Sequence, residues 1–156
     1  MKRMLTIVFL LTMNGCQEVQ TFEVVGTWFM KDQSCEELPI EIKKSLGKLT
    51  ISADGTFIAN ELPKREGGFY SGEYMVRWST ISGSGTWKFF SLSGRSQDLY
   101  LSFKNIDDQE VSYGFPLNIS KKWSTIGLYY YLDDPDLGWK IEFEKSHNKS
   151  YKNHES

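Results

Sequence analysis

The chain is poor in the residues that most often carry catalysis or hold a metal. It has two cysteines, Cys16 and Cys35, and two histidines, His147 and His154, among 156 residues. Both histidines lie in the last ten residues, so neither a Cys–His pair nor a Ser–His–Asp triad can be built on a rigid core. The Cys and His ligands of a closed zinc site are missing as well. We therefore expect no catalytic residue, no metal, no cofactor and no enzymatic activity.

Neither positive nor negative residues are in large excess. The formal net charge is -2, and no run of Lys and Arg is longer than two residues. A protein that binds nucleic acid usually carries a basic patch or stripe that meets the phosphate backbone. We therefore expect neither DNA nor RNA as a partner.

What the sequence does have, first of all, is the pattern of a secretory signal at its beginning. Lys2 and Arg3 precede an uncharged, mostly apolar stretch at 4–13, which Gly15 and Cys16 close. This stretch is well short of the roughly 17–25 apolar residues of a membrane-spanning helix. We expect residues 1–15 to be removed as a signal peptide.

The end of that segment resembles the lipobox of bacterial lipoproteins, in which a small residue precedes a cysteine. The resemblance implies that the Cys16 thiol takes a diacylglycerol and that cleavage leaves Cys16 first, its amine then being acylated by a chain such as palmitate. Gln17 follows the cysteine in place of Asp, which by the same resemblance implies sorting to the outer membrane, facing the periplasm. Residues 16–24 would form a lipidated tether, with membrane lipid as a partner through Cys16.

A second interpretation of the cysteines stays open. In an oxidising compartment Cys16 could form a disulfide with Cys35. The two interpretations exclude each other, because a sulfur held in a thioether cannot also form a disulfide. If Cys16 is lipidated, Cys35 is left as an odd thiol that we expect to serve packing.

Beyond the tether, apolar and polar residues alternate with a period of two, as in Leu99, Leu101 and Phe103. This pattern is typical of strands with one buried face. Nine segments fit it: 25–30, 48–52, 56–61, 73–80, 85–92, 99–104, 110–120, 125–132 and 139–144. Short links with turn residues favour antiparallel neighbours, and Asp54 with Gly55 suits a type I′ turn. The sequence predicts one short helix, at 39–46.

An antiparallel meander of eight or nine strands has to cover both its apolar face and its edges, and a small closed barrel does so. The sequence thus predicts an all-β barrel domain over 25–146 and a polar, disordered tail over 147–156. Gly26, Thr27 and Trp28 resemble the Gly-x-Trp motif that opens the first strand of lipocalins, which implies a lipocalin-like barrel whose floor Trp28 closes. Gly-Thr-Trp recurs at 85–87, where we interpret it as a second strand entry. The final hairpin also resembles the ending of small proteobacterial lipoproteins.

The segment 62–85 combines glycines with aromatic and basic side chains. Aromatic and Arg residues of this kind are enriched in binding hot spots, so we take Tyr70, Tyr74, Arg77 and Trp78 as candidate binding residues. The other interpretation is a strand pair whose glycines allow bends and whose aromatic rings fill the barrel.

Two classes of function fit these observations. The first is a membrane-anchored periplasmic lipoprotein that binds a small apolar or amphiphilic ligand. The second is a protein-binding inhibitor or immunity lipoprotein, which would block a toxin or lytic enzyme of the cell envelope. A barrel of eight strands can pack solid or admit one small ligand, so the sequence leaves both possible.

Overall fold

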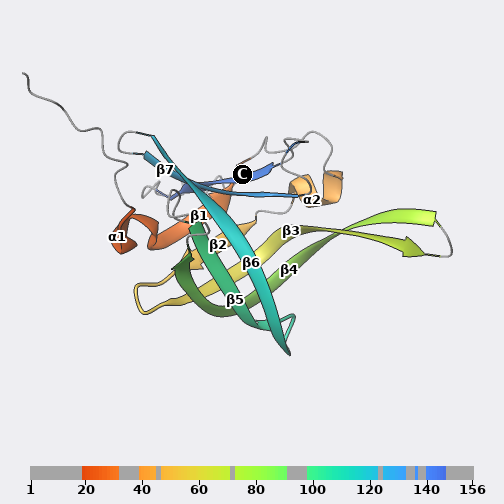
Figure 1. Cartoon of the computed structure of the whole chain (residues 1–156), viewed down its shortest axis with the longest axis horizontal. Helices are drawn as coiled ribbons and strands as arrows, with labels where there is room; N and C mark the ends of the chain where they lie inside the picture. The colour runs from red at the N-terminus through yellow and green to blue at the C-terminus, as the bar shows by residue number, and fades with distance from the viewer. Residues whose placement is uncertain are drawn as a thin grey trace, which may run out of the picture.

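The computed structural model describes residues 19–31, 39–44, 47–70, 73–90, 98–122, 125–132, 136 and 140–146. The predicted signal peptide, both cysteines and the predicted tail lie outside these residues. The strands follow one another around a ring in sequence order (Figure 1). They are β1 (Gly26–Met30), β2 (Lys48–Ile51), β3 (Thr56–Tyr70), β4 (Glu73–Phe90), β5 (Asp98–Ile106), β6 (Gln109–Lys122), β7 (Thr125–Tyr131) and β8 (Lys140–Lys145). The helices of the described residues are α1 (Thr21–Val24) and α2 (Ile40–Lys44).

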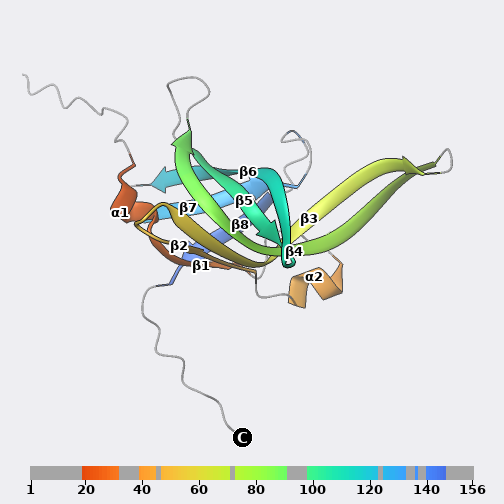
Figure 2. The same ribbon diagram turned by 90° about the horizontal axis from the view of Figure 1, so that it is seen from below.

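The ring closes between its first and last strands. Every strand pairs antiparallel with its neighbours, and β8 returns to β1, with Trp28 opposite Lys145 and Met30 opposite Phe143. The second view shows the strands wrapping around a common interior (Figure 2). Closure removes the two open edges that a flat sheet of this size would expose. The predicted all-β antiparallel meander is confirmed, as a closed barrel of eight strands.

The predicted strands 73–80 and 85–92 are one strand, β4, which is why the count is eight. The Ser-Gly-Ser stretch between them is typical of a turn, but β4 continues through it. A Cβ atom at Gly83 would overlap the carbonyl oxygen of Asn105, so glycine is needed there for close approach to β5. The register with β5 shifts just before Gly85. The second Gly-Thr-Trp therefore lies at an irregularity inside a strand, and its interpretation as a strand entry was wrong.

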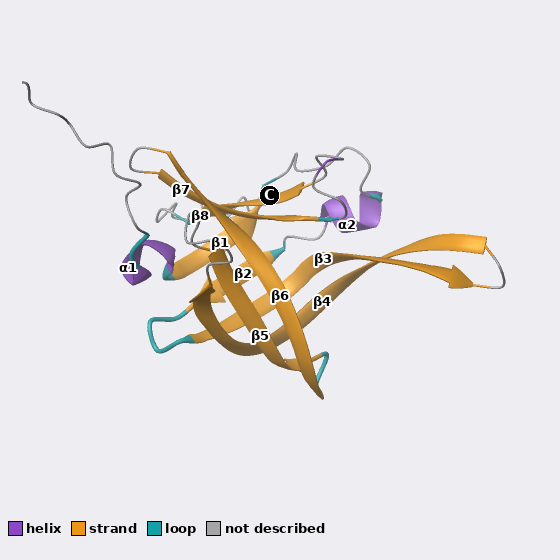
Figure 3. Ribbon diagram, in the orientation of Figure 1, coloured by secondary structure: helices purple, strands orange, loops and turns teal. Residues whose placement is uncertain are grey.

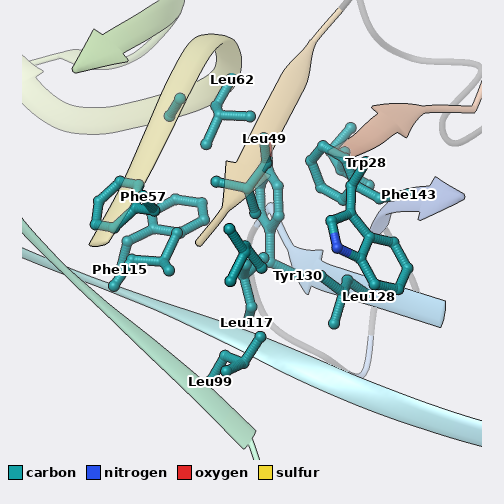
Figure 4. Close-up of a cluster of buried hydrophobic side chains, with 14 of the residues drawn as sticks. Trp28, Leu49, Phe57, Leu62, Leu99, Phe115, Leu117, Leu128, Tyr130 and Phe143 are labelled. Atoms are coloured by element: carbon teal, nitrogen blue, oxygen red, sulfur yellow. The ribbon is translucent and has the colours of Figure 1, made fainter. Parts of the chain in front are cut away.

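The alternating apolar residues of the strands point into the ring and fill it (Figure 4). Phe57 meets Phe103 edge to face with ring centroids 4.8 Å apart, and Phe115 meets Tyr130 in the same way at 4.7 Å. Such aromatic pairs add roughly 0.5–1.5 kcal/mol to the burial of their surfaces. The largest side chains that are less than 2% exposed are Trp28, Phe57, Phe103, Phe143, Leu49, Ile51, Leu62, Leu99, Leu101, Leu117, Leu128 and Ile141.

One end of the barrel is closed by α1, which lies within the predicted tether 16–24. Val24 is fully buried, and its carbonyl accepts a 2.8 Å hydrogen bond from the indole Nε1 of Trp28. Lys145, at the end of the last strand, lies with its ammonium 5.6 Å from the Trp28 ring centre and donates to the Glu23 carbonyl at 2.8 Å. Tryptophan, helix and lysine together form the floor of the barrel.

The side chain of Glu23 ties α1 to the barrel wall. Its carboxylate accepts a 2.7 Å hydrogen bond from the backbone N–H of Gln20 and forms a 2.9 Å ion pair with Lys121 of β6. The Gln20 N–H and the Lys121 ammonium hold the pKa of Glu23 below its ordinary value. A Glu at the third helical position that accepts from the N–H of the residue before the helix is one half of a capping box, and Glu23 is thus a weak sequence signal for α1.

The hairpin turns differ from the expectation in one respect. Asp54 has a negative φ and only Gly55 has a positive one, +85°, so this turn is not type I′. The Asp54 carboxylate instead accepts hydrogen bonds from the Thr56 backbone N–H and hydroxyl, at 2.9 and 2.6 Å. The two-residue loop with positive φ at both positions is Asp107 and Asp108, at 47° and 64°, between β5 and β6.

The second helix lies at the other end of the barrel from α1 (Figure 3). It confirms the helix predicted at 39–46, of which residues 40–44 are helical and 45–46 lie outside the described residues. Ile42 is buried at 7% exposure, whereas Ile40 is 62% exposed. One apolar residue thus anchors α2 beside the strands at the end where β3 and β4 leave the barrel.

Candidate functional site

Much of the segment 62–85 belongs to a two-stranded arm that extends beyond the barrel (Figures 1 and 2). We define the arm as residues 63–70 of β3 and 73–80 of β4, paired from Pro63 opposite Thr80 to Tyr70 opposite Glu73. The pairing of β2 with β3 ends at Asn60, and the pairing of β4 with β5 begins at Gly83. Both outer edges of the arm therefore lack a neighbouring strand within the described part of the chain.

A bulge at the root directs the arm away from the barrel. The register between β3 and β4 shifts between Ala59 and Leu62, and Glu61, within that interval, has a φ of 51°. The Glu61 backbone N–H donates to the Ser82 hydroxyl at 2.9 Å. Bulges of this kind bend a strand and increase its twist. Leu62 is fully buried just past the bulge, so the arm starts from a fixed base.

The four candidate binding residues all lie on this arm. Tyr70 and Tyr74 lie at its far end, where the backbone of Tyr74 is opposite Phe69; their side chains are outside what the structure describes. Arg77 is exposed and opposite Glu66, and Trp78 is partly buried against the barrel core. The structure therefore places Arg77 on the projecting part and Trp78 near its base.

Two exposed apolar residues lie on the arm between its base and its far end. Met75 is 44% exposed and Val76 is 37% exposed, on adjacent positions of β4. Because successive side chains of a strand point to opposite faces, the arm presents one apolar side chain on each face. Neither residue is among the predicted binding residues.

Basic residues at the base of the arm pack on aromatic rings. The guanidinium of Arg65 lies 5.9 Å from the Trp78 ring centre, and the ammonium of Lys64 lies 5.0 Å from that of Tyr113 on β6. Lys64 also forms a 2.7 Å ion pair with Glu66. That pair raises the pKa of Lys64 and lowers the pKa of Glu66, chiefly through the hydrogen bond between them.

Beside the base of the arm lies a cleft of about 360 Å³, which we call the mouth cleft. Its walls come from the arm base and from the stretches where β6 and β7 separate. The pairing of these two strands stops at Asn118 opposite Tyr129. The lining residues are Pro63, Lys64, Arg65, Tyr113, Phe115, Pro116, Asn118, Tyr130, Tyr131 and Leu132.

Tyr130 fixes the inner wall of the mouth cleft. Its hydroxyl donates a 2.6 Å hydrogen bond to the Pro63 carbonyl across the end of the barrel. Burial raises the pKa of this phenol well above its ordinary value, so it stays protonated and remains a donor at neutral pH. A sequence signal existed for Tyr113 and Tyr130, because both occupy inward positions of predicted strands while carrying a polar group.

A second groove, of about 380 Å³, lies between β7 and β8 near the floor. Its charged lining includes Lys31 and Glu142, which form a 3.2 Å ion pair, together with Lys122, Glu144 and Lys145. This groove thus carries both signs of charge, and two of its charged groups, Lys31 and Glu142, already pair with each other. We therefore take the arm and the mouth cleft as the candidate site.

Within the described residues there is no group of three His, Cys, Asp or Glu residues that could hold a metal ion. Over the same residues, no helix is both long and apolar enough to cross a membrane. No protein-family model, no curated protein and no solved structure gives a significant match to this chain.

Proposed function

We propose that the chain is a non-enzymatic binding protein of the bacterial cell envelope that contacts a protein partner through the arm. The observation that carries this proposal is the arm itself, which leaves the barrel with Met75, Val76 and Arg77 exposed on it. A two-stranded ribbon without a third strand is marginal in water. Contact with a second protein would cover its apolar residues and stabilise it.

The shape of the arm fits a partner with a cleft. A narrow ribbon can enter a groove that a barrel wall cannot, which is how an inhibitor or immunity protein would block a toxin or lytic enzyme. Exposed arginine and aromatic residues at the centre of such a contact commonly supply most of the binding energy. Arg77 and the candidate tyrosines at the far end are the groups that would make it.

The two edges of the arm differ in how they would meet a partner. The β3 edge carries Pro63, Lys64 and Arg65, and proline and charged residues discourage the addition of another strand. The β4 edge carries Trp78, opposite Arg65, and Val76, opposite Gly67, and both residue types favour strands. We therefore propose that the partner lies along β4.

A small apolar or amphiphilic ligand is our second proposal, and the mouth cleft favours it. The interior of the barrel is filled by side chains such as Phe57, Phe103 and Phe143, which supports a ligand site at the mouth rather than at the centre of the ring. The proposed location is the same in both cases: the outer membrane, facing the periplasm, with lipid on Cys16.

The lipid anchor can be tested by the intact mass of the mature protein. We expect a chain that begins at Cys16 and carries a diacylglyceryl group and an amide-linked acyl chain, and Cys16→Ser should leave the protein unlipidated. A mature chain without lipid, in which Cys16 and Cys35 form a disulfide, would contradict the proposal.

The arm can be tested with a photo-crosslinking amino acid placed at Val76 in the full-length protein, in the cell that makes it. The matched control is the same group at Ile58, which is 55% exposed on the barrel wall. We expect a discrete crosslinked product from position 76 that is missing from position 58.

With the partner purified, Arg77→Ala combined with Tyr74→Ala should abolish binding while thermal unfolding is unchanged. Equal crosslinking from both positions, or unchanged affinity, would remove the arm from the proposal.

A further inference from the structure

The mouth cleft combines aromatic walls with positive charge. Tyr113, Phe115, Tyr130 and Tyr131 supply four rings, and Pro63, Pro116 and Leu132 complete the apolar surface. The cleft is near the lower end of the range of ligand pockets, roughly 300–1,000 Å³. It would therefore hold a small molecule rather than a long acyl chain.

The cleft exists because two neighbouring strands separate. Beyond the pair Asn118–Tyr129, residues 113–117 of β6 are not paired with residues 130–131 of β7. Pro116 lies in that stretch and has no N–H with which to continue a ladder to β7. The Tyr130–Pro63 hydrogen bond then holds the opening against the base of the arm. The cavity is thus built by fixed backbone features.

The charged groups that line the cleft are both cations. Lys64 and Arg65 lie at its rim, and none of the ten lining residues is acidic. Glu66 contacts the Lys64 ammonium at 2.7 Å without lining the cleft. An ammonium group has three N–H donors, so Lys64 can serve Glu66 and a ligand anion together.

We propose that the mouth cleft binds a small amphiphile that has an aromatic or similarly flat apolar body and one anionic group, the anion being held by Lys64. This inference rests on the second proposal above, a small-ligand binder, and adds the site and the ligand class to it. The apolar body would pack among the tyrosine and phenylalanine rings. The carboxylate, sulfonate or phosphate group would remain at the rim.

Two dyes with the same rings separate the charge from the apolar body. Anilinonaphthalene sulfonate carries the anionic group, and phenylnaphthylamine is the same ring system without it. We expect the purified full-length protein to bind the sulfonate with one dye per chain and more tightly than the neutral dye, measured by fluorescence titration. A charge-assisted hydrogen bond of this kind corresponds to a difference of about tenfold or more in the dissociation constant.

Variants of the lysine assign the anion to its site. Lys64→Met should weaken the binding of the sulfonate by about tenfold and leave the binding of the neutral dye unchanged. Lys64→Arg should keep the preference for the anion. The matched control is Lys48→Met, which removes a lysine that lies 6.0 Å from the Phe29 ring centre outside the cleft. Tyr131→Ala should weaken the binding of both dyes, because it removes part of the wall of the cleft. Circular dichroism melting checks that each variant is folded.

The outcomes separate this inference from the proposals on which it stands. If the neutral dye binds as tightly as the sulfonate, or if Lys64→Met and Lys48→Met behave alike, the anion site is wrong while the small-ligand proposal stands. If neither dye binds, the small-ligand proposal fails with it. The arm proposal is independent of both results, because its crosslinking position, Val76, does not line the cleft.

Discussion

The hydroxyl of Tyr130, on β7, donates a 2.6 Å hydrogen bond to the carbonyl of Pro63, on β3, although the two residues are 67 positions apart. The bond spans the end of the barrel from which the arm departs. It therefore connects the base of the arm to the far wall, and it shapes the mouth cleft as well.

Tyr130→Phe removes this hydrogen bond while keeping the ring. We expect the free energy of unfolding to fall by about 1–3 kcal/mol, because the buried Pro63 carbonyl loses its partner. Urea denaturation followed by circular dichroism measures the change. The control is Tyr129→Phe, whose ring is half-buried on the outer face, and the two variants should differ. Equal stability of the Tyr130→Phe and unaltered proteins would show that the bond contributes nothing.

Trp28→Ala tests the floor of the barrel. Trp28 is fully buried and its indole donates to the Val24 carbonyl, so we expect a loss of about 3–5 kcal/mol. Trp87→Ala is a matched control, because the Trp87 indole also donates to a carbonyl, that of Ser52 at 2.9 Å, but its ring is only partly buried. A smaller loss at Trp28 than at Trp87 would contradict the assignment of Trp28 as the packed floor.

Acidification should weaken the attachment of α1. The folded protein holds the pKa of Glu23 below the ordinary value of 4.5, so the unfolded chain takes up this proton first as the pH falls. The stabilising contribution of Glu23 is therefore complete above pH 4.5 and is lost as the pH falls through the lower folded value. Melting temperatures measured between neutral and acidic pH should fall less steeply for Glu23→Gln than for the unaltered protein.

Removal of the arm should leave the barrel intact. Arg65 and Trp78 are opposite each other, so residues 66–77 can be replaced by an Asn–Gly turn that joins them and keeps Trp78 packed against the core. Leu62 and Ile81 remain in the core, and we expect the free energy of unfolding to change by less than about 1 kcal/mol. Crosslinking experiments with this variant, using a group at Lys64, should give no partner. Loss of cooperative unfolding would instead make the arm part of the folding unit.

The strands of the barrel could be predicted from sequence because burial follows the alternation of residues. Leu99, Leu101 and Phe103 were expected to be inward and are all at most 2% exposed. The alternation could not show where a strand continues through glycine. Ser82, Gly83 and Ser84 have the composition of a turn, and only the close approach of Asn105 explains why glycine is required in a continuous strand.

Only part of the candidate site could be predicted from the sequence. The composition of the segment 62–85 indicated binding residues, and the structure places Arg77 exposed on a projecting arm. The arm itself could not be predicted, because it depends on how far β2 and β5 extend alongside β3 and β4. The mouth cleft was missed for a related reason, since Lys64 and Tyr130 are far apart in sequence and meet only through the closure of the ring.

The pairing of β1 with β8 also has a consequence for biosynthesis. Strand β1 remains without its second neighbour until β8, Lys140–Lys145, the last strand of the described residues, has been made. In a nascent chain that lacks β8, strands β1 and β7 each have an unpaired edge, and the barrel cannot close. If the precursor is secreted as proposed above, the barrel could close only after β8 had crossed the membrane.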